Sequence, residues 1–478
     1  MSYKWVAAAE GGLTLHSAYI CLGAFITRSM SAITVNQQHL RLMKEDFLHY
    51  IWQHQYFDKA DLRTSGGEAV TVLKPGFRNA DAGPDFPGAR LRIGEVEWNG
   101  AVEIHVRASD WARHNHQTDL KYDQVILHVV LTNDALVHRT NGTLVPTLAL
   151  DCRLLPGLLA RYEELVEAPL AATLPCAPLL GQVSSLTKTM MRERTLLERV
   201  ERKADTLMDL HQRQGQDWEA TTWHALAAAF GFQKNSEPLA RLAKALPLAV
   251  LRRHRHSLHQ LEALVFGQAG FLVENEETVN DAYITALRQE HDFLRHKYDL
   301  SIGALAVHEW NYLRLRPANF PPVRLGQLTG LLHARPALFD ALLTAADVPA
   351  LMAFFQAPAP EYWRTHYRPG RGGKVPGLGQ SSIHLLIINV VVPLRVAYAR
   401  HTGQQAVVES TVNLLAELPA EHNQYTDLYA QVGFECRTAA DSQGLLALHQ
   451  GYCQPRRCLH CTIGAQLVRQ PRLIAPQP

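Results

Sequence analysis

The apolar pattern of this chain changes its period near residue 155, and this change constrains the fold more than any other feature. Before it, runs such as EAVTVLKPG, YDQVILHVVL and GTLVPTLAL are rich in β-formers, and Pro or Gly interrupts or ends some of them. After it, LLPGLLARYEELVE and KTMMRERTLLERVERKADTLMDLHQRQ repeat apolar residues at helical spacing. We therefore predict an α/β domain followed by a large, mostly α-helical region.

The same pattern divides the chain into four segments. Residues 1–42 show no clear periodicity, and the strong segment MKEDFLHYIWQHQYF starts at Met43. We predict that residues 1–42 are an extension before the natural start; the alternative is a weakly packed N-terminal arm. Residues 43–152 are predicted to form the α/β domain and residues 153–365 a helical domain. A Gly-rich loop, further helices and a cysteine cluster are expected in residues 366–478.

Composition and charge limit the class of protein. Hydrophobic residues make up 47% of the chain and charged residues 19%, as expected for a folded chain rather than a disordered one. The net charge of +2 gives no global attraction to nucleic acid or membranes, although it leaves room for a local basic groove. The apolar run IHLLIINVVVPL is too short to span a bilayer and contains Asn389. A cytoplasmic protein without a membrane segment is expected.

The stretch from Asn79 to Trp111, NADAGPDFPGARLRIGEVEWNGAVEIHVRASDW, carries the densest set of chemically useful side chains. Side chains alternate along a strand, so Glu103 and His105 face the same side, about 6.5 Å apart. Asp85 follows a Gly-Pro at the start of the preceding run. An Asp that faces this Glu-x-His would make a cage for Mg²⁺ or Mn²⁺.

The position of the hairpin turn decides whether this cage forms. Local turn chemistry favours a turn at Asn99-Gly100, which would pair Asp85 near His114. A turn at Gly94-Glu95 would instead place Asp85 opposite Glu103 or its neighbour. Gly100 would then be a bulge or a site of close approach.

The order of elements and these acidic residues resemble the PD-(D/E)xK nuclease superfamily over roughly residues 43–150. The resemblance implies a restriction-endonuclease-like α/β domain in which Asp85 and Glu103 bind a divalent cation. It also implies that Glu45, on the first predicted helix, assists the catalytic residues. The motif is short and degenerate.

His105 departs from this pattern, because the superfamily usually has Lys at that position. A neutral His can bind metal or act as a general base, but it gives no fixed positive charge. Arg107, Arg90 and Lys121 are the candidates for that charge. The departure leaves open a degenerate core that binds nucleic acid without cleaving it.

Nearly everything after Met43 also resembles a bacterial family of proteins of unknown function, domain-of-unknown-function family 2851. The matching pieces are MKEDFLHYIW, NADAGPDFPGARLRI, WNGAVEIHV, SDWARHNHQTDLKYDQVILHVV and CLHCTIG. This resemblance implies no activity.

Two histidines follow the hairpin in SDWARHNHQTDLKYD. His114 and His116 are two residues apart, so on an extended loop they face one side and could bind zinc or phosphate. With His105 they give an alternative interpretation, a zinc enzyme. The other alternative is a polar loop in which Asp110 caps a short helix and the histidines are solvated or hydrogen-bonded. His128, in an apolar run, is expected to be a core residue.

The C-terminal cysteines are clustered at Cys436, Cys453, Cys458 and Cys461. Four thiolates suit a structural Zn²⁺ site or, as an alternative, a [4Fe–4S] cluster. The spacing departs from the two CxxC pairs of common zinc ribbons, so free or buried thiols are the third alternative.

Two segments are rich in basic residues. MMRERTLLERVERKAD alternates Arg and Lys with acids, which predicts a salt-bridged solvent face. RPGRGGKVPG places Arg371 and Lys374 on a Gly-rich loop, where they could hold a phosphate backbone, or form part of a mobile surface loop.

Together these patterns predict a metal-dependent phosphodiesterase acting on DNA or RNA. Asp85, Glu103, His105 and Glu45 would form the catalytic centre. Substrate would be held by Arg107, His114, His116, Arg371 and Lys374. The alternative function is a non-catalytic nucleic-acid-binding or scaffold protein.

Overall fold

The computed structural model describes residues 44–79, 81–155, 157–167, 174–274, 276 and 278–469. The chain divides into two compact units. The sheet unit comprises the described residues up to Val183 together with those from Arg456 onward, and the helical unit runs from Ser184 to Pro455. The predictions about residues 1–42 and a start at Met43 lie outside the described residues. The domain boundaries predicted at residues 152 and 365 stay predictions.

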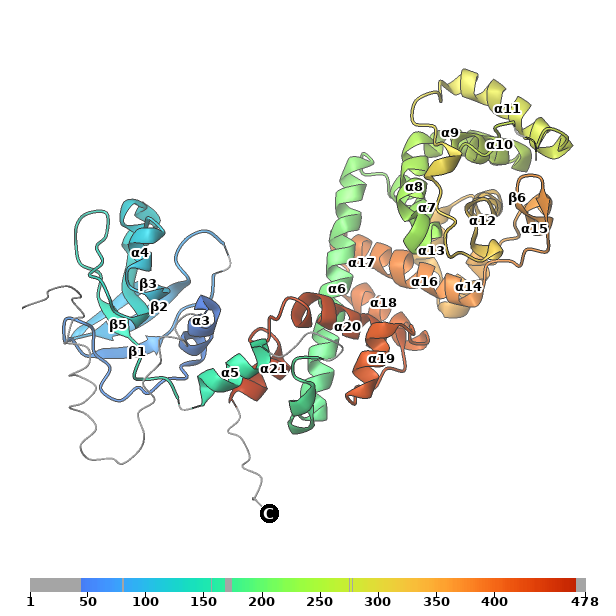
Figure 1. The fold of residues 1–478 in the computed structure, drawn as a ribbon. Coiled ribbons are helices and arrows are strands. Elements are labelled where there is room, and N and C mark those ends of the chain that lie inside the picture. Colours follow the sequence, from blue (N-terminus) through green and yellow to red (C-terminus); the bar gives the residue numbers. More distant parts are fainter. Residues whose placement is uncertain are drawn as a thin grey trace, which may run out of the picture. The chain divides into compact units, whose positions relative to one another are not determined.

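The sheet unit contains both the strands of the large sheet and a few short helices (Figure 1). Its elements are α3 (Glu45–His54), β1 (Val70–Lys74), β2 (Phe86–Ile93), β3 (Val96–Arg107), α4 (Asp110–Arg113), η1 (His116–Thr118), η2 (Leu120–Gln124), β4 (Val125–Thr132), β5 (Thr147–Ala149), α5 (Leu158–Glu167), η3 (Ala177–Gln182) and α21 (Thr462–Arg469).

The five strands form one mixed sheet in the order β1-β2-β3-β4-β5. β1, β2 and β3 are antiparallel neighbours, whereas β3, β4 and β5 run parallel. β5 lies at the edge and begins directly after Pro146, which cannot donate to a ladder. Helix α3 packs against β3 and buries Phe47, Leu48 and Trp52. The prediction of a domain with a sheet and helices, followed by a mostly helical region, is confirmed.

The β2–β3 hairpin turns at Gly94-Glu95, and the turn that local chemistry favours, at Asn99-Gly100, is not formed. Ile93 pairs with Val96, and Gly94 adopts a φ of 61° in the left-handed region. Gly100 lies inside β3, where a Cβ atom would come within 2.5 Å of Ile126 Cγ2. The close approach of β4 therefore explains this glycine.

The helical unit consists of packed helices and one small hairpin (Figure 1). Its elements are α6 (Ser185–Arg213), α7 (Trp218–Phe230), α8 (Phe232–Ala245), α9 (Leu248–His254), α10 (Leu258–Gln268), α11 (Ala282–Tyr298), η4 (Val307–Glu309), η5 (Pro317–Asn319), α12 (Pro321–Ala334), α13 (Leu338–Thr344), α14 (Val348–Phe355), α15 (Glu361–Thr365), β6 (His366–Arg368), β7 (Arg371–Gly372), α16 (Gln380–Leu386), η6 (Ile387–Val391), α17 (Val392–His401), α18 (Gln405–Glu417), α19 (Gln424–Gln431), α20 (Ala439–Leu448) and η7 (His449–Cys453).

Side-chain caps define where several of these helices begin. Ser184 accepts a hydrogen bond from the Thr187 amide at the start of α6, and Asp217 caps α7 in the same way. The short segments η6 and η7 are single π-helical turns that continue α16 and α20.

One apolar helical stretch, Gln380–His401, is long enough to cross a membrane by length and composition. It is therefore longer than the apolar run alone suggested. Its most apolar window is 72% buried inside the protein, as in the core helix of a soluble protein. Ile387, Val391 and Leu394 are among the residues of this stretch that the core buries.

Candidate metal centre

Asp85 and Glu103 face each other across the β2–β3 hairpin. Phe86 pairs with Val102 in antiparallel register. Asp85, which directly precedes β2, therefore falls opposite Glu103 of β3. The Asp85 amide donates a hydrogen bond to Glu103 Oε2 (3.0 Å), and the Ile104 amide donates to Asp85 Oδ2 (3.0 Å). Each carboxylate is thus held by the backbone of the opposite strand. The structure brings together the two acids that the sequence selected.

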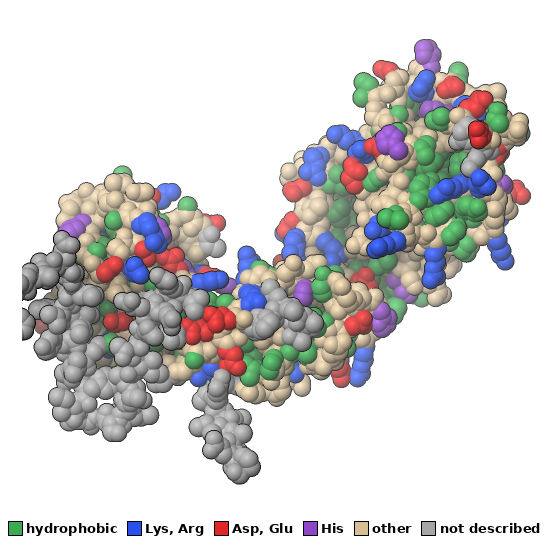
Figure 2. All heavy atoms as spheres, viewed as in Figure 1, with side chains coloured by type: hydrophobic (Ala, Val, Ile, Leu, Met, Phe, Trp, Pro, Cys, Tyr) green, Lys and Arg blue, Asp and Glu red, His purple; other side chains and the backbone are tan. Residues whose placement is uncertain are grey.

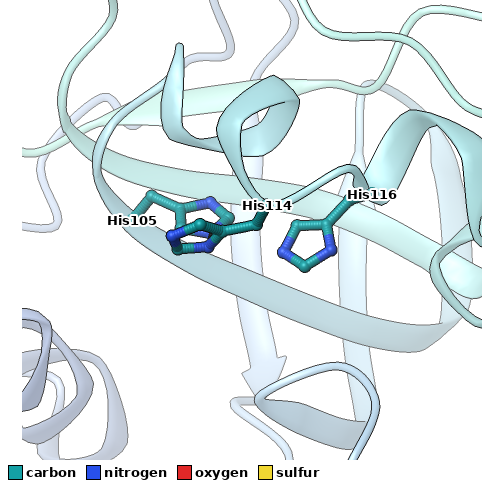
Figure 3. Close-up of side chains that lie close together, drawn as sticks. All are labelled: His105, His114 and His116. Atoms are coloured by element: carbon teal, nitrogen blue, oxygen red, sulfur yellow. Dashed lines mark hydrogen bonds between the residues drawn. The ribbon is translucent and has the colours of Figure 1, made fainter.

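Three imidazole rings lie close to one another (Figure 3), and two of them contact the Glu103 carboxylate. Glu103 Oε1 lies 3.7 Å from His105 Nε2 and 3.4 Å from His116 Nε2. His105 Nε2 is also 3.1 Å from His114 Nδ1. The close-up shows the ring of His105 beside the rings of His114 and His116, which follow α4.

These donors fit a single divalent cation. One nitrogen from each of the three histidines lies within 4.8 Å of the others. Two ligand atoms that are each about 2.1 Å from one metal lie up to about 4.2 Å apart. Small side-chain rotations would therefore bring the three nitrogens within binding distance of one cation. Imidazole nitrogens with carboxylate oxygens are the donors that Mn²⁺ and Zn²⁺ accept, whereas Mg²⁺ prefers oxygen alone.

The segment that follows β3 positions His114 and His116. Asp110 Oδ2 accepts a hydrogen bond from the Arg107 amide, which fixes the start of α4. Asn115 then adopts a left-handed φ of 63°, and the next residue re-enters the site. The ring of Tyr122 stacks on His116 with centroids 3.7 Å apart. His116 is buried by this packing and is therefore not solvated, whereas a loop with hydrogen-bonded histidines stays an alternative.

His128 on β4 is fully buried, as predicted for a core residue, and it also contacts His105. Its Nε2 lies 2.9 Å from His105 Nδ1. If His105 Nε2 offers its lone pair to a cation, His105 Nδ1 carries the proton and donates to His128. A second histidine that fixes the tautomer of a metal ligand is typical of metal sites.

Helix α3 adds two further side chains. His49 Nε2 lies 3.0 Å from Asp85 Oδ2, and Glu45 is one helical turn earlier. The sequence analysis selected Glu45 and missed His49. The signal was their spacing of four residues, which places both on one helix face, on the same i, i+3, i+4, i+7 stripe as the buried Leu48 and Trp52.

Burial determines the protonation of the centre. It lowers the pKa of His105 to about 2 and that of His128 to about 3, so both rings are neutral at physiological pH. Burial also raises the pKa of Glu103 and of Glu45, which lie near the charge of Asp85. A bound cation would offset the cost of these buried carboxylates.

The other predicted substrate-binding residues lie outside this cluster. Arg107 is exposed at the end of β3, and the exposed Arg90 pairs with Glu97 (3.0 Å). Arg371 and Lys374 belong to the helical unit, on and just after the β6–β7 hairpin. Their predicted role stays a prediction.

The predicted four-cysteine site also stays a prediction. Cys436 and Cys453 belong to the helical unit, and Cys458 and Cys461 belong to the sheet unit. Burial raises the pKa of Cys458 to about 11, and the neighbouring Cys461 thiol acts in the same direction. Within the described residues, the histidine trio is the group of three or more ligands that converges.

Comparison with known proteins gives a family. Residues 45–424 match the family model described as Protein of unknown function (DUF2851). No curated protein and no solved structure matches the chain.

Proposed function

Since the chain belongs to this family of unknown function, we propose from its metal centre that the protein is a metal-dependent phosphodiesterase that cleaves nucleic acid. The observation that supports the proposal is the convergence of Asp85, Glu103 and His105 at the β2–β3 hairpin. This arrangement is similar to the PD-(D/E)xK nuclease pattern, with Glu45 on the preceding helix.

The donor set favours Mn²⁺ over Mg²⁺ as the cation. Glu103, His105, His114 and His116 supply imidazole nitrogen as well as carboxylate oxygen. When bound, such a cation polarises a phosphate oxygen and lowers the pKa of its bound water.

The protein's own groups would divide the remaining tasks. His105 has both ring nitrogens engaged by other histidines, so it acts as a ligand rather than as the base. Glu45, whose pKa burial raises, is the proposed proton acceptor for the attacking water. Arg107, two residues beyond His105, is the proposed contact to phosphate in place of the missing Lys.

Cleavage of labelled DNA and RNA in Mn²⁺, Mg²⁺ or Zn²⁺ tests the proposal. Glu103→Gln should abolish cleavage. Glu97→Gln is the matched control, because it makes the same change on the exposed part of the same strand. Cleavage that survives Glu103→Gln would reject the assignment. Binding without cleavage by the wild-type protein would instead favour the non-catalytic alternative.

The three imidazoles also favour a second candidate, a zinc enzyme whose substrate is not nucleic acid. His105, His114 and His116 would hold Zn²⁺ and leave a position for water, as three-ligand catalytic zinc sites do. Metal analysis that finds one zinc per chain, lost in His116→Ala, with no cleavage of either nucleic acid, would support this candidate over the first.

A further inference from the structure

The helical unit contains a large groove that lies outside the metal centre. Its volume is about 1550 Å³, and residues of α6, α7, α8, α19 and the π-helical turns η6 and η7 contribute to its lining. Small-molecule sites usually have volumes of about 300–1000 Å³. The groove is therefore large enough for an extended ligand.

Helix α6 carries the basic segment for which a salt-bridged solvent face was predicted, and the structure confirms that prediction only in part. Arg192 pairs with Asp441 (3.1 Å) and Arg194 with Glu198 (2.8 Å). Arg199 and Lys203 instead donate to side-chain amides.

Arg199 and Lys203 line the groove and donate to neutral amides. Arg199 Nε donates to Gln443 Oε1 (2.7 Å), and Lys203 Nζ donates to Asn389 Oδ1 (2.7 Å). Among the described residues, no carboxylate lies within ion-pair distance of either cation. Burial lowers the pKa of Lys203 to about 7, the neighbouring charge of Arg199 acts in the same direction, and Glu421 opposes both.

The cations of the groove are arranged as a row. Arg199, Lys203 and Arg213 share one face of α6, at spacings of four and ten residues, and Lys244 on α8 joins them. At 1.5 Å per residue, Arg199 and Arg213 are about 21 Å apart along the helix axis. Glu421 is the one acid in the lining. A row of this length exceeds one phosphate group and fits several in succession.

Two irregular turns and two aromatic rings complete the lining. Asn389 lies in the π-helical turn η6 and Gln450 in η7, and Gln450 Oε1 accepts from Arg199 Nη1 (3.2 Å). Single π-helical turns recur at functional sites. Phe232 and Tyr425 also line the groove, and aromatic rings are the surfaces on which unpaired bases stack. Figure 2 shows Lys and Arg side chains on the visible face of the helical unit.

We infer that this groove binds the phosphate backbone of a single-stranded nucleic acid. The cations outnumber the single acid of the lining, Glu421, and therefore select an anion. The length of the row and its aromatic neighbours select a strand over a single phosphate. The choice of nucleic acid rests on the proposed function, whereas the preference for a polyanion rests on the groove alone.

Fluorescence anisotropy with labelled 15-nucleotide DNA and RNA, in EDTA, tests the inference without requiring the metal centre. The variant is Arg213→Gln with Lys244→Gln, because both side chains are exposed and make no hydrogen bond in the described structure. The matched control is Arg202→Gln with Lys234→Gln, which removes the same charges from the same two helices outside the groove lining.

The groove variant should raise Kd about tenfold and reduce the slope of log K against log salt by about 1.4, or about 0.7 per lost phosphate contact. The control should bind like the wild-type protein. Equal losses in both variants would overturn the inference, since they would indicate diffuse charge. Displacement of the oligonucleotide by inorganic phosphate at similar concentration would also overturn it, in favour of a free-phosphate site.

Cleavage measured in parallel separates the two claims. Impaired binding by the groove variant, with no cleavage by the wild-type protein, would support the groove and reject the nuclease. Cleavage by the wild-type protein, together with undiminished binding by the groove variant, would support the nuclease and reject the groove.

Discussion

The amide of Asp85 donates a hydrogen bond to Glu103 Oε2 at 3.0 Å, across the β2–β3 hairpin. The side chain of Asp85 is in turn held by the amide next to Glu103. Two carboxylates are thereby kept close although like charges repel, which is an arrangement that a bound cation stabilises.

Replacing His128 with Phe should weaken Mn²⁺ binding about tenfold, because His105 loses the partner that fixes its tautomer. Isothermal titration measures the affinity. His128→Gln, which keeps an acceptor, should recover part of it. His138→Phe is the control, because His138 is exposed on the same unit. Unchanged affinity in His128→Phe would show that the second histidine has no positioning role.

Replacing Gly100 with Ala should destabilise the sheet unit by about 2 kcal/mol, since the new Cβ would meet Ile126 and the Gln124 carbonyl oxygen at 2.5 and 2.7 Å. Thermal unfolding of the full chain measures the change. Gly181→Ala is the control, because its Cβ would meet nothing within 4 Å. Equal melting temperatures for the two variants would contradict the packing described for β3 and β4.

Glu262 should make the helical unit less stable as pH rises. Burial raises the pKa of this carboxyl to about 7, and its side chain accepts a hydrogen bond from Trp363 Nε1 (3.0 Å). The folded state therefore retains a proton that the unfolded chain releases near pH 4.5. The resulting stability is complete below that pH and is lost as pH rises through about 7.

Urea unfolding at pH 5 and pH 8 checks this dependence. Between these pH values the ionisation of Glu262 should lower the unfolding free energy of the wild-type protein by about 2 to 3 kcal/mol, and Glu262→Gln should lack that part of the decline. The control is Glu201→Gln on the exposed face of α6. A decline of the same size in Glu262→Gln and the control would contradict the prediction.

Much of the architecture could be predicted from the sequence, because periodicity reports which face of each element is buried. The position of the hairpin turn could not be settled in this way. Asn99-Gly100 has the stronger local turn chemistry, but the glycine is required by the close approach of β4, a long-range contact.

The candidate site was predictable where neighbouring strands carry it, and not where distant segments meet. Glu103 and His105 follow from alternation along one strand. His49 comes from a helix far earlier in the chain, and the link between His105 and His128 depends on the parallel pairing of β3 with β4. The groove on α6 could not be predicted for a related reason. Only the fold shows that Arg192 and Arg194 form ion pairs whereas Arg199 and Lys203 contact amides.

Mn²⁺ binding tests the central claim most directly. Electron paramagnetic resonance of the purified full chain should detect one bound Mn²⁺ per chain, with nitrogen hyperfine coupling from the histidines. In Glu103→Gln the affinity should fall at least about tenfold, while Glu97→Gln should bind as the wild-type protein does. A chain that binds no Mn²⁺, or that binds it equally well after Glu103→Gln, would contradict the account.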